Sequence, residues 1–405
     1  EASAAGAKRP RLGTETAAPV ACAGGSNGSR SRRPLHVLGV GTPTHDTGAC
    51  LLRDGVVVHA VNEERFSREK LDSEFPRRCI KHILETEGLQ PCDIDVVALG
   101  LFGGANAKSE QMLAVMRRLH DAPPAEAVHE RLDVAHQRDV HFANLAEESL
   151  LRMGFARSQV RWYDHHLCHA YAAFYCSTFE GATVVTFDGR GDCLSGTVYE
   201  AQRSSEAAGP GGEPPGFRLL AVTTFLDSVG YLYSIVTQLL GFKPFHHEGK
   251  VTGLAAKGLS RRGQKGGTFE VLSKAVWLEE EPGTRGLNPR TGRPMWGIRT
   301  DLTGQYYKAF STATPPRLLE ELSRHTPEDI AAGIQDITEH IVCEYMQRNG
   351  FLAPQMCVAG GLFANVKLNQ RLRELPGVSN VYVFPHMGDG GIHIGAAMLA
   401  TAGVS

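Results

Sequence analysis

Residues 183–199 read TVVTFDGRGDCLSGTVY, which is a buried-type strand, a turn of glycine and acidic residues at 188–192, and a second strand. The same kind of unit occurs at residues 35–53, with its turn at 41–48, and the two units begin about 145 residues apart. A repeated strand–turn–strand opening is typical of a protein with two lobes and approximate internal twofold symmetry. The sequence therefore predicts an α/β fold with two related lobes.

The rest of the chain alternates strand-like and helix-like segments, which predicts a sheet covered by helices in each lobe. The length of 405 residues exceeds what one hydrophobic core usually serves. We expect a disordered leader at 1–34, a first lobe at 35–180 and a second lobe at 181–405. Further strands are expected at 56–61, 94–101, 159–163, 356–359 and 380–384, and helices at 76–87, 228–241, 327–348, 363–374 and 391–400.

Composition narrows the classes of function. The formal net charge of -2 argues against a nucleic-acid or anionic-membrane partner, and no apolar run is long enough to span a membrane. Nine cysteines without a CxxC pair suit a reduced, cytoplasmic compartment. Residues 1–34 are basic and lack apolar periodicity, so a nuclear or organelle targeting signal is the alternative to a plain linker.

Residues 164–169 read DHHLCH and precede a helix expected at 170–175. His165 and His169 are four residues apart, so on a helix both imidazoles project from one face. This spacing predicts a metal site, with Asp164 as N-cap or outer hydrogen-bond acceptor. Because 17 histidines give roughly 0.7 such pairs by chance, the pair needs a third ligand. Asp389, in a predicted strand-to-helix turn, is the expected third ligand.

Three glycine turns predict phosphate sites, because amides that lack a neighbouring Cβ can approach anions closely. An ordinary hairpin is the alternative for the turn at 188–192, and a structural strand-to-helix corner is the alternative at 359–369. Lys250 follows Gly249 at a helix start, where a solvated pair with Glu248 is the alternative. The residues assigned to cofactor binding are Asp188, Gly189, Gly191, Lys250, Gly360, Gly361, Asn365 and Gly388.

Eight motifs follow one another between residues 35 and 400. They are GVGTPTHD at 39–46, EERFSR at 63–68, FP at 75–76, HHLCHA at 165–170, DGRG at 188–191, EGKV at 248–251, AGG at 359–361 and GDGG at 388–391. In this order they closely resemble the O-carbamoyltransferase family of nodulation and antibiotic biosynthesis, which includes tobramycin and cephalosporin carbamoyltransferases.

The resemblance implies the two-lobed fold of the actin-like and sugar-kinase-like ATPase superfamily, built from duplicated ribonuclease H-like lobes. It implies an iron site, with zinc or manganese as alternatives, formed by His165, His169 and Asp389. It also implies that carbamoyladenylate binds at the glycine turns, after a YrdC-like domain has made it from carbamoyl phosphate and ATP with Mg²⁺. The sequence stops after the final predicted helix, so either it is a fragment or a separate YrdC-like partner supplies the intermediate.

The predicted reaction is enzymatic transfer of a carbamoyl group from carbamoyladenylate to a hydroxyl of a small molecule. His45, oriented by Asp46, is the candidate general base, and a turn-capping His–Asp pair is the alternative. Residues 278–298 are predicted to be a surface loop or lid that sets acceptor choice. Two other functions remain open. One is an inactive module that binds nucleotide and metal; the other is threonylcarbamoyl transfer to tRNA, which the lack of a basic stripe disfavours.

Overall fold

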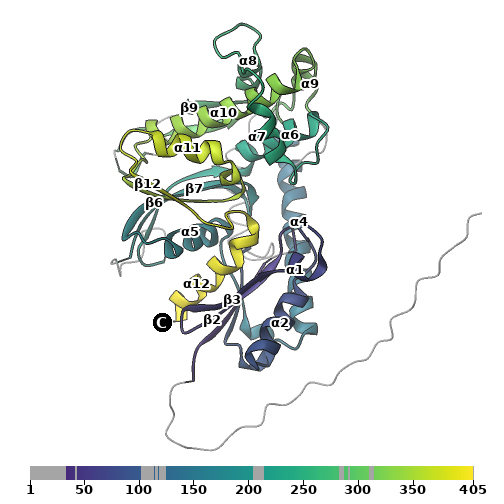
Figure 1. Ribbon diagram of the computed structural model, residues 1–405, viewed down its shortest axis with the longest axis vertical. Helices are drawn as coiled ribbons and strands as arrows, with labels where there is room; N and C mark the ends of the chain where they lie inside the picture. Colours follow the sequence, from purple (N-terminus) through teal and green to yellow (C-terminus); the bar gives the residue numbers. More distant parts are fainter. Residues whose placement is uncertain are drawn as a thin grey trace, which may run out of the picture. The chain divides into compact units, whose positions relative to one another are not determined.

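Two five-stranded sheets with the same strand order carry the fold in this computed structural model (Figure 1). The structure describes residues 33–41, 43–101, 114, 117, 125–203, 214–281, 287–290, 292–309 and 314–404. All elements below belong to the unit Pro34–Ser405. The predicted leader at 1–34 lies almost entirely outside the described residues.

The first sheet has the order β3-β2-β1-β4-β5, and the second has the order β8-β7-β6-β11-β12. In each, the first three strands pair antiparallel and the last two join in parallel. This identity of order and direction confirms the predicted two-lobed α/β fold. The strands of the first sheet are β1 His36–Val40, β2 Gly48–Arg53, β3 Val56–Asn62, β4 Val96–Leu99 and β5 Val160–Trp162. Those of the second are β6 Gly181–Gly191, β7 Leu194–Gln202, β8 Phe217–Thr224, β11 Gln355–Ala359 and β12 Asn380–Val383.

The repeated hairpins form because their strands are apolar and their turns are not. Every residue of β1 is buried, as is most of β6, so both strands lie at the centre of their sheets. Asp54 and Gly55 join β2 to β3 with φ values of 48° and 80°, which a tight hairpin turn requires. These sheet centres bring the ends of β1 and β6 to the functional site.

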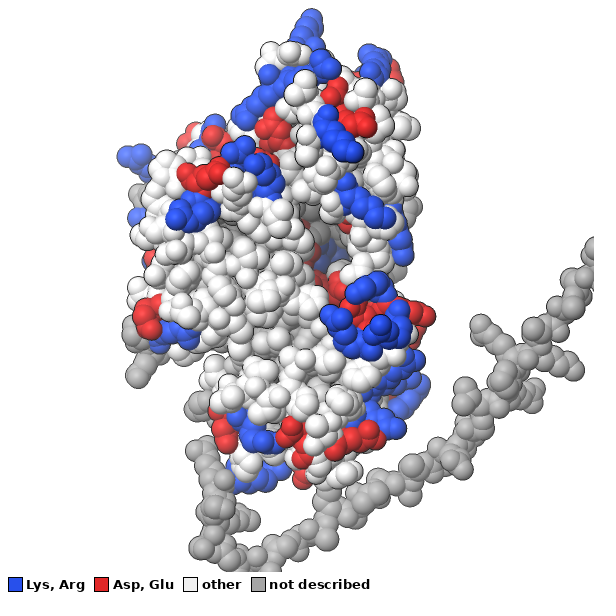
Figure 2. All heavy atoms as spheres, in the orientation of Figure 1, with Lys and Arg blue, Asp and Glu red and all other residues white. Residues whose placement is uncertain are grey.

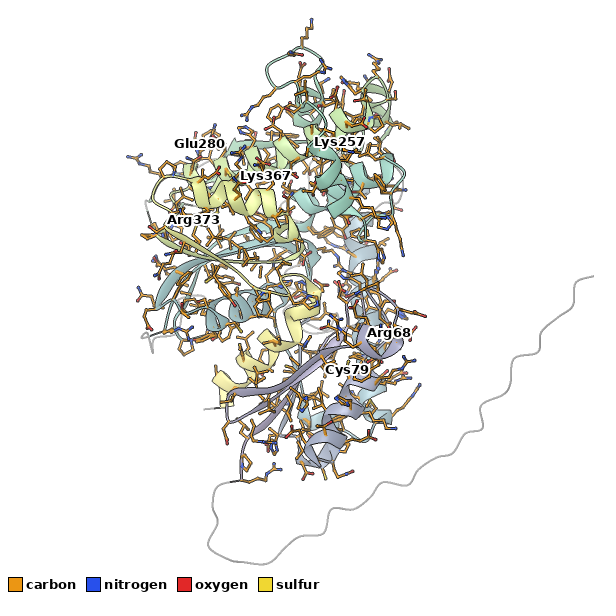
Figure 3. All side chains as sticks on the ribbon, viewed as in Figure 1. Arg68, Cys79, Lys257, Glu280, Lys367 and Arg373 are labelled. Carbon is orange, nitrogen blue, oxygen red and sulfur yellow. The ribbon has the colours of Figure 1, made fainter. Side chains whose placement is uncertain are left out.

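The helices cover both sheets, and the five helices predicted over 76–400 are confirmed within a few residues. Short 3₁₀ turns include η4 Gly361–Ala364 and η5 Asp389–Gly391. Figure 3 labels Cys79 on α2 of the first lobe and Lys367 on α11 of the second. The helices are α1 Glu64–Ser67, α2 Arg77–Glu87, α4 Ala125–Arg152, α5 His165–Cys176, α6 Val229–Leu239, α7 Glu248–Ala255, α8 Thr268–Ser273, α9 Pro316–Leu322, α10 Pro327–Arg348, α11 Val366–Glu374 and α12 Ile392–Val404.

Two helices cross between the lobes. Helix α5 follows the first sheet but packs on β6, β7 and β11, whereas α12 follows the second sheet but packs on β1, β2 and β4. The two helices also contact each other, and their small apolar residues share one buried cluster with both sheets. A Cβ on Gly395 of α12 would overlap the carbonyl oxygen of Cys168, so glycine permits this close approach. The crossing places the first turns of α5 and α12 side by side.

Helix α4 contributes to the cores of both lobes. Val128, Leu132 and Ala135 near its start are buried in the core of the second lobe, and Ala146 and Leu150 near its end are buried in that of the first. No described helix has the length and apolar character needed to cross a membrane.

The prediction that residues 278–298 form a surface loop or lid is wrong at both ends of this range, where the chain forms strands. Strands β9 Val276–Glu280 and β10 Trp296–Thr300 pair antiparallel there, and Val276 and Ile298 are buried in the second lobe's core. The acidic, glycine- and proline-rich composition concealed two short strands that tertiary burial stabilises.

Candidate functional site

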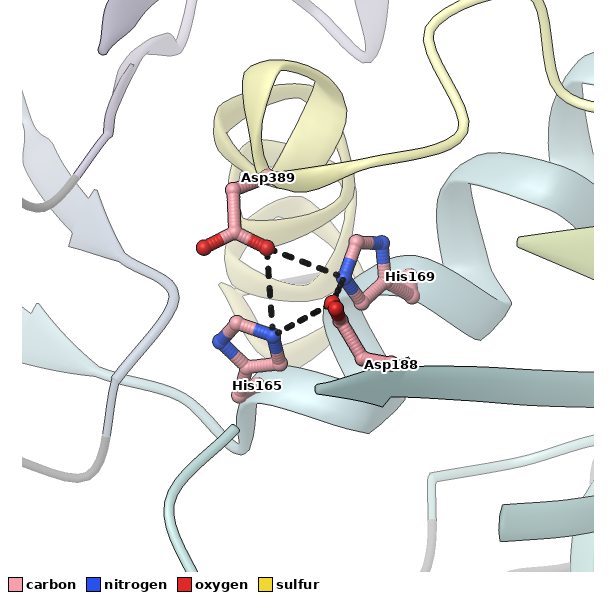
Figure 4. A group of neighbouring side chains, drawn as sticks. All are labelled: His165, His169, Asp188 and Asp389. Atoms are coloured by element: carbon pink, nitrogen blue, oxygen red, sulfur yellow. Dashed lines mark hydrogen bonds and ion pairs between the residues drawn. The ribbon is translucent and has the colours of Figure 1, made fainter. Parts of the chain in front are cut away.

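Two imidazoles and two carboxylates converge where the lobes meet (Figure 4). One potential ligand atom from each of His165, His169, Asp188 and Asp389 lies within 4.8 Å of the others. Asp188 Oδ2 is 3.6 Å from His165 Nε2 and 3.2 Å from His169 Nε2. Asp389 Oδ1 is 3.6 Å from both nitrogens. The structure thus brings together the three predicted metal ligands and adds Asp188, which sequence reasoning had assigned to the nucleotide.

The start of α5 fixes the two histidines. Asp164 caps the helix, because its Oδ1 accepts from the backbone N–H of Leu167 at 2.6 Å. The backbone N–H of His165 donates to Asp192 Oδ2 at 3.0 Å, which ties the helix to the turn after β6. A Cβ on Gly191 would overlap the His165 ring, so this turn needs glycine to admit the imidazole. Both histidine side chains are almost fully buried.

The two carboxylates come from strand and helix ends. Asp188 stands near the end of β6, where its Oδ1 accepts from the backbone N–H of Gly189 at 2.6 Å. Asp389 opens η5, immediately before α12, and its Oδ2 lies 3.5 Å from the Thr44 hydroxyl. Each carboxylate therefore turns one oxygen toward His165 and His169, and its other oxygen contacts a neighbouring backbone N–H or hydroxyl.

Burial and the neighbouring charges shift the pKa values of His165 and Asp188 in this cluster. Burial lowers the pKa of His165, but Asp389 and Asp188 outweigh that effect and raise it to about 9. Burial raises the pKa of the Asp188 carboxyl, but the nearby imidazoles of His165 and His169 hold that pKa well below its usual range. The ionised Asp188 carboxylate therefore favours positive charge at the centre of the cluster.

The four side chains fit a divalent cation. Ligands about 2.1 Å from one ion at tetrahedral angles lie about 3.4 Å apart, which is close to the separations seen here. His165 Nε2 is buried and has no hydrogen-bond partner within the described part of the chain, so it faces the centre of the cluster without one. Imidazole with carboxylate is a donor set that suits iron, zinc or manganese.

His45 lies beside this cluster, on the turn between β1 and β2. Its Nδ1 is 3.4 Å from Asp46 Oδ2 and its Nε2 is 3.6 Å from Asp389 Oδ2. The imidazole is partly exposed, at 41% of its side-chain surface, whereas the cluster histidines are not. Burial lowers the pKa of His45, but Asp389, Asp46 and Asp188 outweigh it and raise the pKa to about 9. Asp389 therefore contacts the predicted base and the predicted metal ligands at once.

A cleft of about 450 Å³ opens over the cluster, and Figure 2 shows a hollow with acidic and basic side chains at its edge. Lys250 does not line this cleft, because its ammonium lies over the ring of Phe242. Gly360 does not line the cleft either. Its φ is 97°, and its N–H donates to Met387 O at 2.6 Å. Of the eight residues assigned to cofactor binding, those in the lining are Asp188, Gly189, Gly191, Gly361, Asn365 and Gly388.

Asn365 lines the cleft, but its side-chain oxygen and nitrogen form hydrogen bonds within the protein. Its Oδ1 caps α11 by accepting from the backbone of Lys367 and Leu368, and its Nδ2 donates to Gln335 Oε1 at 2.8 Å. Its amide is therefore committed to positioning the turn that follows β11.

Sequence reasoning missed several residues of the cleft. Arg190 forms a buried, two-pronged ion pair with Asp139 of α4, which joins α4 to the turn that holds Asp188. Arg138 and Phe142 of the same helix also line the cleft. Arg190 lies in the DGRG motif but had no role assigned to it, whereas the α4 residues carry no motif and only their place on that helix reveals them.

Comparison with known proteins identifies the family. The sequence model of the family described as Carbamoyltransferase N-terminus matches residues 36–398. The chain therefore belongs to this carbamoyltransferase family, which confirms the resemblance that the eight motifs predicted.

The matched relatives are longer than this chain. The nodulation protein NolNO of Sinorhizobium fredii is 29% identical over 362 residues, which cover 88% of this chain and 46% of that protein. An uncharacterized Synechocystis protein, sll1178, is 28% identical over 378 residues, or 90% of this chain and 56% of its own. The chain thus spans about half the length of the curated relatives it matches.

Among solved structures, the phosphate- and nucleotide-bound form of full-length HypF matches with a TM-score of 0.44 and 14% identity, over 91% of this chain and 55% of that one. HypF of T. kodakarensis matches with a TM-score of 0.42 and 13% identity, over 92% of this chain and 49% of that one.

Proposed function

We propose that the chain transfers a carbamoyl group from carbamoyladenylate to a hydroxyl of a small-molecule acceptor. The observation that carries this proposal is the buried group of two imidazoles and two carboxylates at the base of a cleft lined by glycine turns. Membership in the carbamoyltransferase family supports the group that is transferred. The small-molecule acceptor, the adenylate donor and iron as the metal follow from the motif resemblance.

In this proposal His165, His169, Asp188 and Asp389 hold a divalent cation, most simply iron. When bound, the cation would polarise the mixed anhydride and neutralise charge on the departing phosphate. Gly361 and Gly388 line the same cleft, and their backbone amides would donate to phosphate oxygens. The side chains thus fix the cation while the turns supply preorganised donors.

The transfer itself needs a base on the acceptor side. The acceptor oxygen attacks the carbamoyl carbon, the bond from that carbon to the phosphate oxygen breaks, and AMP leaves with the bonding electrons. In its neutral form, His45 takes the proton from the acceptor hydroxyl at Nε2, while Asp46 faces Nδ1 and orients the ring. The partial exposure of His45 leaves Nε2 accessible from the cleft. A cation held by Asp188 and Asp389 would favour that neutral form, because it would offset the carboxylate charges that raise the pKa of His45.

The donor would be made elsewhere, from carbamoyl phosphate and Mg²⁺-ATP, by a YrdC-like domain or protein. The greater length of the relatives is compatible with such a second activity in the same polypeptide. A reducing, cytoplasmic setting is supported by cysteines of the described part of the chain that form no disulfide, namely Cys50, Cys79, Cys168, Cys176, Cys193, Cys343 and Cys357.

Elemental analysis of anaerobically purified protein tests the cation site. Wild type should contain near-stoichiometric iron, zinc or manganese, and alanine variants of each of the four ligands should lose it. Calorimetry should then detect ADP binding with metal but not after chelation. Equal ADP affinity with and without metal would exclude the phosphate–metal contact.

Supplied carbamoyladenylate tests the transfer. Metal-loaded wild type should release AMP and carbamoylate an added alcohol, and the chelated protein should do neither. AMP release that is indifferent to chelation and to His45→Ala would contradict the proposed function.

A further inference from the structure

Two apolar residues of the cleft have a left-handed backbone. Leu71, from the first lobe, has φ 55°, and Phe245, from the second lobe, has φ 62°. Both line the cleft. Apart from them, the non-glycine residues with positive φ in the described ranges are Asp or Arg. A bulky side chain in this conformation is strained, and such strain gathers at functional sites.

A glutamate holds each of these strained residues in place. The backbone N–H of Leu71 donates to Glu64 Oε2 at 3.3 Å, and Lys70 pairs with the other oxygen of the same carboxylate. The backbone N–H of Phe245 donates to Glu248 Oε1 at 2.6 Å, and the Ser234 hydroxyl donates to the same oxygen at 2.8 Å. Both conformations are therefore fixed by specific bonds.

Each residue also adjoins one of the two repeated turns. The chain after Leu71 is bonded to the turn of His45, because Thr47 N–H donates to Asp72 O at 3.0 Å. The Phe245 ring lies over the other turn, with its edge 3.8 Å from where a Cβ on Gly189 would stand. It also packs edge-on against Tyr231, with ring centroids 5.8 Å apart.

Phe245 remains 50% exposed although it is held so firmly. An aromatic ring that is already fixed at a cleft loses little conformational freedom when a ligand covers it, so its burial contributes to affinity. Leu71 lies on the side of the predicted base His45, and Phe245 lies over the turn that follows Asp188. A molecule that touches both would therefore lie next to the turn of His45 and to the turn that follows Asp188.

We propose that Leu71 and Phe245 are specificity-determining contacts for the acceptor, and that the acceptor presents an apolar face next to its hydroxyl. This proposal rests on the proposed carbamoyl transfer. The glycine turns at Gly361 and Gly388 adjoin each other in the same cleft and would take the nucleotide, and the proposal gives Leu71 and Phe245 to the acceptor.

Two vicinal diols that differ by an apolar ring test the proposal, namely trans-1,2-cyclohexanediol and ethylene glycol, each with supplied carbamoyladenylate. Wild type should prefer the cyclic diol in kcat/KM by about tenfold or more. Leu71→Asn and Phe245→Asn keep a residue that tolerates positive φ but remove the apolar face. Each should remove most of the preference, while AMP release to water stays within about twofold of wild type. Leu259→Asn, an exposed leucine outside the cleft lining, is the matched control.

The outcomes separate this proposal from the proposed function. An unchanged preference in both variants, or a rise in the KM of carbamoyladenylate instead of the diol, would overturn the acceptor contact. Absence of AMP release from wild type would count against the transferase activity alone. In that case saturation-transfer NMR with the same diols still decides, because ring protons of the cyclic diol should receive saturation from wild type but not from Phe245→Asn.

Discussion

The turns after β1 and β6 occupy equivalent places in the two lobes, yet they carry different chemistry. Each contains an aspartate with φ 54°, Asp46 in the first and Asp192 in the second. The first turn presents His45 to Asp389, whereas the second presents Asp188 to the histidine pair. Duplication thus fixes where side chains converge, and later substitution decides what each does.

The helices after the last strand of each sheet show the same division. Helix α5 supplies His165 and His169 from its N-terminal half, and the segment that opens α12 supplies Asp389. Because each helix packs on the other lobe's sheet, ligands separated by more than 200 residues in sequence meet at one point. The candidate cation site is therefore a product of the crossing as much as of the motifs.

The sharpest test of this comparison exchanges carboxylate for amide in each turn. Asp188→Asn should weaken metal binding by more than about a hundredfold, because even the outer hydrogen-bond partners of metal ligands are worth about 10–100-fold. Asp46→Asn should weaken it by less than about tenfold, because Asp46 contacts His45 rather than the histidine pair. Competitive titration with a chromophoric chelator measures both affinities. Equal losses would mean that the two turns have not diverged.

The next test removes His45, because the first turn carries this imidazole and the second turn has none. His45→Ala should slow carbamoyl transfer by about a hundredfold to ten-thousandfold, because a positioned base contributes that range, and should leave metal content unchanged. Single-turnover rates with supplied carbamoyladenylate, paired with elemental analysis, measure the two effects separately. His340→Ala on α10 is the control. Loss of metal along with activity would make His45 a further ligand.

The sequence predicts most of the fold because the information for it is local. Apolar runs bounded by Gly–acidic turns define β1, β2, β6 and β7, and their recurrence reveals the duplication. The crossing of α5 and α12 is not predictable in this way, because both helices are apolar and either sheet could bury them. Pairing depends on close approaches such as that of Gly395 to Cys168, which appear only in three dimensions.

The same dependence on three-dimensional packing explains which residues of the site could be predicted from the sequence. The spacing of His165 and His169 is visible in the sequence, and Asp389 follows from its turn. Asp188 also stands in a visible turn, but which of its neighbours it faces depends on the packing of α5 against β6. Phe245 and Leu71 carry no periodic or motif signal, because positive φ at an apolar residue is set by tertiary bonds.

A third prediction tests the crossing itself. Gly395→Val should destabilise the protein by about 3 kcal/mol or more, because its side chain would be forced into the backbone of α5 at Cys168. Gly253→Ala is the matched helical glycine. It should stabilise by about 0.5–1 kcal/mol, because nothing lies within 4 Å of the added methyl group. Urea unfolding monitored by circular dichroism measures both changes. A mild effect of Gly395→Val would show that α5 and α12 can separate without loss of the fold.

The smallest expected effect concerns how the two equivalent helices begin. A side-chain cap at Asp164 starts α5, whereas the 3₁₀ turn η5 leads into α12 without a side-chain bond from its own N-cap, Gly388. Asp164→Ala should therefore cost about 1 kcal/mol of unfolding free energy, and Asp164→Asn, which keeps a capping oxygen, only a few tenths. Thr326→Ala, at the cap of α10, should cost a similar amount but leave metal affinity unchanged. If the cap also orients the histidines, Asp164→Ala should weaken metal binding and Thr326→Ala should not. Equal metal affinity in the two alanine variants would show that Asp192 holds His165 in place without the Asp164 cap.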